Sequence, residues 1–144
     1  MKYLIGLFII GTALAASDLN PLFKPLTKNA PFLLKREVEK ALKEVKSSGS
    51  QLESSMAWVN LNHDDHKDLC LSLAHPFFGQ AAGQITCYLA KDSSSFVEVI
   101  KVNNVMPEKV NVSNNLTQGH YDLTFSGPGM SPPKIWKWNG IRYH

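Results

Sequence analysis

Short segments in which apolar and polar residues alternate fill the chain from residue 51 onward. A period of two is typical of strands that bury one face, with either Trp58 or Val59 facing the core in the first segment. The segments cover residues 54–61, 68–74, 84–91 and 95–102. Because polar or glycine-containing turns join them closely, we expect a twisted antiparallel sheet, a meander of about five to seven strands.

The two cysteines, Cys70 and Cys87, fall in neighbouring segments. In an exported chain, oxidising conditions favour a disulfide between them, and the alternative is a pair of buried free thiols. If the two segments form a hairpin with Cys70 opposite Cys87, the same register places Leu73 opposite Gln84. The sequence therefore predicts a cross-strand disulfide that fixes the register of this hairpin.

An α-helix is expected before the strands. Residues 32–46 carry apolar side chains at helical spacing, and the charged side chains opposite them are interpreted as a solvated face. We expect Asn29 to be the N-cap and Pro31 to lie in the first turn. The apolar positions are Leu34, Val38, Ala41, Leu42 and Val45. The sequence therefore predicts an α+β fold in which an N-terminal helix packs on one face of the sheet.

Residues 1–16 have the features of a secretory signal peptide: a basic residue at the start, an apolar stretch, and small residues at a cleavage site. Residues 17–31 contain three prolines and are expected to form an extended Pro-rich leader arm. Residues 32–144 then form a single α+β domain, secreted or periplasmic after cleavage. The apolar stretch is too short for a comfortable span, so we expect no membrane span in the mature form.

The charge of the chain argues against two classes of partner. The chain has 15 basic and 12 acidic side chains, and the loss of Lys2 with the signal peptide leaves 14 against 12, which lowers the net charge from +3 to +2. A balance so close to neutral does not favour a nucleic acid or a membrane surface. The sequence has neither the G-x-S-x-G nor the H-E-x-x-H motif, and we expect neither a covalent hydrolase nor a cofactor.

The run from residue 119 to residue 143 holds two of the three tryptophans. Residues 121–125 alternate like a half-buried strand, and the Gly127-Pro128-Gly129 loop follows. A second strand over residues 135–138 then meets Asn139-Gly140, the dipeptide best suited to a type I′ turn. The chain is therefore expected to end in a hairpin.

This run resembles the C-terminal end of small exported bacterial proteins of unassigned activity. In that pattern a Gly-x-x-Asp-aliphatic strand leads to a Gly-Pro-Gly loop and then to Trp-x-Trp-(Asn/Asp)-Gly-x-x-Tyr. The matching positions are Gly119, Asp122, Leu123, Gly127, Pro128, Gly129, Trp136, Trp138, Asn139, Gly140 and Tyr143. The resemblance covers the end of the chain and implies an exported β-rich domain with no particular activity.

The aromatic side chains of the predicted hairpin lie beside cations, and such sets can stack on sugars or on the side chains of a partner. The alternative is that one indole closes the core and the other covers its edge. The candidate binding residues are Trp136, Trp138, Tyr143, Lys137, Arg142, Pro128 and Met130. We expect a non-enzymatic exported binding protein, effector-like or inhibitor-like, that recognises a protein or glycan partner outside the cytoplasm.

A polar turn supplies the alternative function. His63, Asp64 and His66 lie close together in the sequence, and imidazole and carboxylate groups are the usual ligands of zinc and manganese. With His120 as a further ligand, they could form the site of a metal-assisted hydrolase. A polar hairpin turn without a metal is the simpler interpretation of the same residues.

Overall fold

The computed structural model describes residues 20–46, 51–129 and 132–144. The predicted signal peptide, residues 1–16, lies outside the described residues. The helices and strands are β1 (Lys24–Pro25), α2 (Phe32–Val45), β2 (Glu53–Val59), β3 (Asp68–Ala74), the 3-10 helix η2 (Pro76–Phe78), β4 (Gly83–Ala90), β5 (Phe96–Val105), β6 (Val110–Thr117) and β7 (His120–Phe125).

The strands that the structure describes form two antiparallel sheets, which confirms the α+β class. Within the described residues, β1 to β5 form a five-stranded sheet in chain order, and β6 and β7 form a separate pair. The expectation of one sheet was wrong in this respect. An alternating pattern shows that a segment is a strand, but it does not show which other strand the segment pairs with.

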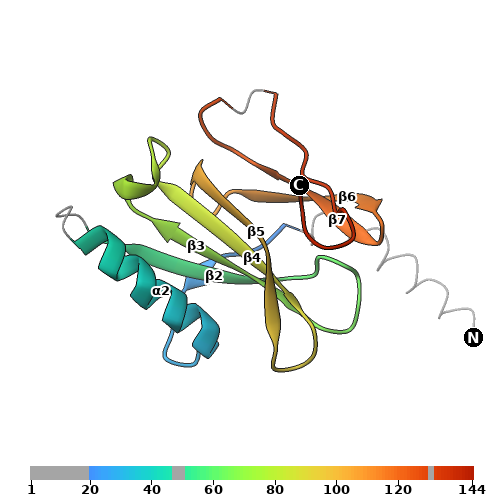
Figure 1. Ribbon diagram of the computed structural model, residues 1–144, viewed down its shortest axis with the longest axis horizontal. Helices are drawn as coiled ribbons and strands as arrows, with labels where there is room; N and C mark the ends of the chain where they lie inside the picture. Colours follow the sequence, from blue (N-terminus) through green and yellow to red (C-terminus); the bar gives the residue numbers. More distant parts are fainter. Residues whose placement is uncertain (1–19, 47–50, 130–131) are drawn as a thin grey trace, which may run out of the picture.

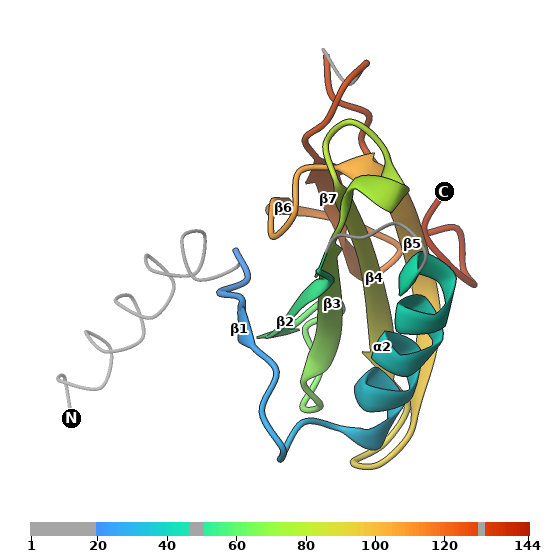
Figure 2. The ribbon, with the colours of Figure 1, turned by 90° about the vertical axis from the view of Figure 1, so that its left-hand side faces the viewer.

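The five-stranded sheet is covered on both faces. α2 packs on one face, and β6, β7 and the C-terminal segment lie on the other (Figures 1 and 2). The alternation along β3 explains both contacts, because its leucines join the core under the helix and Cys70 joins the core under the small sheet. Central strands of such a layered arrangement are buried on both faces, as β3 and β4 are.

Two details of the helix differ from expectation. α2 is not N-terminal, because the short strand β1 precedes it. Its N-cap is Pro31 rather than Asn29, and in the described part of the chain no side chain caps this end. The backbone N–H of Asn29 donates to the Thr27 hydroxyl, so Asn29 belongs to a turn before the helix. Within the described residues, no helix has the length and apolarity needed to cross a membrane.

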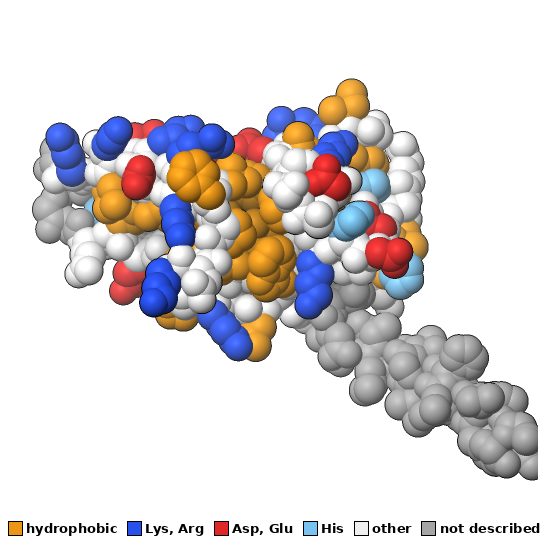
Figure 3. All heavy atoms as spheres, turned by 90° about the horizontal axis from the view of Figure 1, so that it is seen from below, with side chains coloured by type: hydrophobic (Ala, Val, Ile, Leu, Met, Phe, Trp, Pro, Cys, Tyr) orange, Lys and Arg blue, Asp and Glu red, His pale blue; other side chains and the backbone are white. Residues whose placement is uncertain are grey.

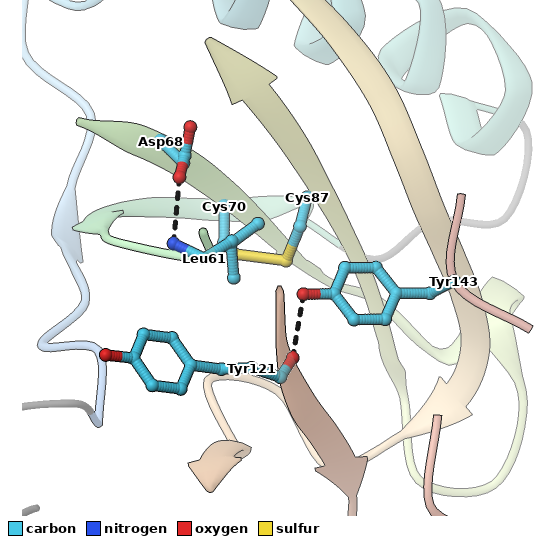
Figure 4. Close-up of a disulfide and its surroundings, with 6 residues drawn as sticks. All are labelled: Leu61, Asp68, Cys70, Cys87, Tyr121 and Tyr143. Atoms are coloured by element: carbon cyan, nitrogen blue, oxygen red, sulfur yellow. Dashed lines mark hydrogen bonds between the residues drawn. A yellow bond between two sulfur atoms is a disulfide. The ribbon is translucent and has the colours of Figure 1, made fainter. Parts of the chain in front are cut away.

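The predicted disulfide between Cys70 and Cys87 is present. The register is also confirmed, with Cys70 opposite Cys87 and Leu73 opposite Gln84. Both cysteines are fully buried in the core that the large sheet forms with β6, β7 and the C-terminal segment. Figure 4 shows the bond beside Tyr143, so the disulfide lies inside the molecule.

The C-terminal hairpin is shorter than expected and its turn is displaced. Trp138 forms an isolated bridge with Tyr143. The backbone N–H of Asn139 donates to the Arg142 carbonyl at 3.0 Å, and the Asn139 side chain accepts the N–H groups of the two residues after Gly140. The predicted type I′ turn centred on Asn139-Gly140 is therefore wrong, and the turn centre lies one residue later. Asn side chains favour such local hydrogen bonds to the backbone two residues on.

Candidate binding surface

Two of the candidate binding residues belong to the core. Trp138 is 7% exposed and Tyr143 is 2% exposed. The Trp138 indole stacks on the His120 ring with 3.9 Å between centroids, and the Tyr143 hydroxyl donates to the Tyr121 carbonyl at 2.8 Å (Figure 4). Trp138 and Tyr143 therefore pack inside the molecule and leave little surface for a partner.

Trp136 covers the edge of that core. It is half-buried, and its ring meets Phe125 edge-to-face with 6.2 Å between centroids. The ammonium group of Lys134 lies 3.7 Å from the centroid of the Trp136 ring, a cation–π contact. One indole in the core and the other at its edge is the packing alternative considered above.

The remaining candidates differ in their accessibility. Lys137 donates to the buried carboxylate of Asp122 at 2.9 Å, so its charge already has a partner. Pro128 and Arg142 are exposed, and Met130 lies outside the described residues. A binding role for the hairpin therefore stays a prediction that rests on its exposed members.

The histidines of the polar turn do not form a metal site with their neighbours. His63 Nδ1 lies 2.8 Å from the Tyr121 hydroxyl, and one oxygen of Asp64 accepts the backbone N–H of His66 at 3.0 Å. In the described chain, no three His, Cys, Asp or Glu side chains are grouped so that they could hold a metal ion. His120, the proposed further ligand, lies against Trp138. The contacts fit the simpler interpretation of a polar turn.

A tryptophan outside the predicted set is the most accessible of the three. Trp58 in β2 is 47% exposed, whereas the next residue, Val59, is buried. Trp58 lies on the same face of the sheet as Met56, which packs on the core under α2. The Phe96 ring lies beside it, with 6.4 Å between centroids and an angle of 44° between the planes. The alternation in the sequence left open which of Trp58 and Val59 faces the core.

Hollows flank the exposed indole. One of about 320 Å³ is lined by Trp58, Asp65, His66, Lys67, Asp92, Ser93 and Phe96, and we call it the Trp58 hollow. A second, of about 330 Å³, is lined by Trp58 and by Leu22, Lys24, Pro25, Thr27, Met56 and Ala57. Figure 3 views the molecule from below and shows hydrophobic side chains gathered in the middle of this face, with charged side chains of both signs on either side.

The polar rim of the Trp58 hollow is largely free to bind. The side chains of Asp65, Lys67 and Ser93 are exposed and, within the described residues, have neither a hydrogen-bond partner nor an ion-pair partner. Asp92 accepts the backbone N–H of Ser94 at 2.9 Å, and this hydrogen bond lowers the pKa of the Asp92 carboxyl. The rim therefore offers a charged carboxylate together with open donors and acceptors.

Comparisons with protein-family models, with curated proteins and with solved structures gave no match for this chain. The resemblance of the C-terminal run to small exported bacterial proteins therefore stays a prediction.

Proposed function

We propose that this protein is an exported, non-enzymatic binding protein that recognises a protein or glycan partner outside the cytoplasm. The observation that carries the proposal is the exposure of Trp58 beside Phe96, at the edge of a hollow with an open polar rim. Large aromatic side chains beside a few convergent polar groups are typical of recognition sites, and a tryptophan left half in water gives up much of its burial energy.

Two buried acidic side chains, Asp122 and Asp68, have structural hydrogen bonds, which is consistent with a binding function. The carboxylate of Asp122 accepts the Thr117 hydroxyl at 2.7 Å and the Lys137 ammonium at 2.9 Å. Both oxygens of Asp68 accept backbone N–H groups. These acids have structural partners, whereas general acid–base chemistry needs a group within reach of a substrate. The disulfide supports the exported location, because such bonds persist in oxidising compartments.

The test compares single variants of the exported protein in one binding screen. Immobilised protein would be presented with a glycan array and with a panel of purified secreted proteins. We expect a partner whose binding is lost in Trp58→Ala and retained in Phe77→Ala, the matched control, because Phe77 is a 55% exposed aromatic residue elsewhere on the surface.

The same screen separates the two candidate surfaces. Loss of binding in Arg142→Ala with retention in Trp58→Ala would move the binding site to the C-terminal hairpin. If no member of either panel binds the wild-type protein, the proposed binding function fails. Circular dichroism of each variant shows that the fold is retained, as expected for exposed positions.

A further inference from the structure

We propose that the Trp58 hollow is a binding site for a neutral saccharide. This inference rests on the proposed binding function and names the chemical class of its ligand. Three features of the hollow support it: an exposed indole, a rim that offers both donors and acceptors, and a charge balance that does not attract anions.

The aromatic plane has the shape that a sugar ring needs. The Phe96 ring lies beside the Trp58 indole with 6.4 Å between centroids, and Trp58 is 47% exposed, so the indole offers ring surface to a ligand. A sugar ring has a face of C–H groups that can stack on an indole and a perimeter of hydroxyl groups that needs hydrogen bonds. The volume of about 320 Å³ lies at the lower end of the range of roughly 300–1,000 Å³ for small-molecule sites.

The rim matches the perimeter of such a ring. A hydroxyl group both donates and accepts, so a saccharide site needs partners of both kinds. The Lys67 ammonium and the Ser93 hydroxyl can donate, and the carboxylates of Asp65 and Asp92 can accept. Lys67, Ser93 and Asp65 have no competing partner in the described chain, so binding a sugar breaks none of their hydrogen bonds.

The charges favour a neutral ligand. Two carboxylates, Asp65 and Asp92, face one ammonium group, Lys67, in the same hollow. The hollow therefore gives an acidic saccharide or an anionic peptide no net electrostatic attraction, whereas a neutral saccharide needs none.

The neighbouring structure argues for a sugar rather than a peptide strand. A peptide that added to the edge of β2 would need its free backbone groups. β1 already occupies part of that edge, at Ser55 and Met56, so a peptide strand could not pair along the whole of β2. Leu22 lies alongside in the second hollow. Because Trp58 lines both hollows, an oligosaccharide can extend from the first into the second across the indole.

The experiment uses a printed glycan array, followed by calorimetric titration of chitotetraose and cellotetraose into the exported protein. We expect at least one neutral oligosaccharide on the array to bind, with a change in tryptophan emission. Trp58→Ala should weaken binding by about tenfold or more, because it removes the stacking plane. Trp58→Phe should retain part of the affinity, Asp65→Asn should weaken it less than Trp58→Ala, and Phe77→Ala should have no effect.

Three results would overturn the inference: binding of acidic glycans alone, undiminished binding by Trp58→Ala, or no neutral glycan bound at millimolar concentration. Failure here is distinct from failure of the binding function. Suppose that no neutral glycan binds, but that a secreted protein of the earlier panel binds the wild type and not Trp58→Ala. The proposed binding function is then supported, and the proposal of a neutral saccharide as its ligand is rejected. If both panels give nothing, both proposals fall.

Discussion

Asp68 is a buried carboxylate that ties together two distant parts of the chain. One of its oxygens accepts the backbone N–H of Leu61 and the other accepts that of Ala90, each at 2.8 Å (Figure 4 shows the first). Asp68 is fully buried at the start of β3. It therefore joins the loop after β2 to the end of β4, and both of its oxygens are needed.

We expect Asp68→Asn to lower the free energy of unfolding by about 1–3 kcal/mol. An amide has a single acceptor oxygen, so one of the two buried N–H groups would lose its partner. Urea unfolding followed by tryptophan fluorescence measures the change. Asp65→Asn is the matched control, because Asp65 is exposed and should tolerate the change. Equal stability of Asp68→Asn and the wild type would contradict this role.

The same residue gives a pH dependence. Burial raises the pKa of the Asp68 carboxyl above its ordinary value of 3.8 and outweighs the two backbone hydrogen bonds, which lower it. The native state therefore binds this proton more readily than the unfolded chain. The resulting stabilisation is complete below the unfolded pKa and is lost as the pH rises through the raised pKa.

In the wild type, we expect the contribution of Asp68 to the free energy of unfolding to decrease as the pH rises. Asp68→Asn should show no such decrease, because its amide does not titrate. Urea titrations of both proteins at a series of pH values from about 3 to 7 measure the difference between their slopes. Parallel curves for the two proteins would show that Asp68 does not titrate in this range.

At this scale the sequence predicted the strand positions better than the side-chain roles. The alternation placed Trp58 and Val59 next to each other as equivalent candidates for the core, and the structure buries only Val59. The sequence does not indicate that the Asp68 side chain is buried, because its partners are backbone N–H groups, which almost any residue could supply. Neither the best candidate site nor the key buried acid could therefore be identified from residue types alone.

At the scale of elements, the alternating pattern predicted a strand and its pairing correctly where the cysteine pair also constrained the register. The segment 68–74 coincides with β3, and the cysteine pair fixed its register with β4. β6 was harder to predict, because Val110 and Val112 are its buried residues and the rest of the strand is polar or exposed. β6 pairs with β7 on the face of the large sheet opposite α2. Alternation of apolar and polar residues does not predict which strands pair or which face they cover.

A glycine in β4 allows two backbones to approach closely. Gly83 pairs with Val105 in β5, and a Cβ atom at Gly83 would overlap the Val105 carbonyl and lie 2.8 Å from the backbone nitrogen of Pro107. We expect Gly83→Ala to destabilise the protein by about 1–3 kcal/mol through this overlap. Thermal unfolding measures the loss, and Gln84→Ala is the control at the next position. A melting temperature of Gly83→Ala that matches the control would exclude the overlap.

At the scale of the whole molecule, the core is divided by the large sheet into two halves. The half under α2 is built on leucines of β3, and the half under β6 and β7 contains the disulfide with Phe125, Trp138 and Tyr143. The backbone N–H of Tyr143 also donates to the Val99 carbonyl at 3.1 Å, which ties the C-terminal segment to β5. The two halves share β3 and β4, so their stabilities are coupled.

We expect the double variant Cys70→Ala/Cys87→Ala to lose about 3 kcal/mol of unfolding free energy, since the bond closes a short loop in the unfolded chain. The measurement is urea unfolding under non-reducing conditions. The reduced wild type is the control, because it tests the same loss without the change of side chains. Stability equal to that of the oxidised wild type would mean that the bond does not stabilise the fold.

The position of the disulfide beneath the small sheet also sets an order in time. Neither cysteine is exposed, so an oxidant cannot reach the thiols after β7 and the C-terminal segment have docked. We therefore expect the bond to form before β7 and the C-terminal segment dock, while Cys70 and Cys87 are still accessible. In the folded molecule a reductant reaches the disulfide only when β6, β7 and the C-terminal segment separate from the large sheet. The rate at which the disulfide is reduced therefore measures how often this layer opens.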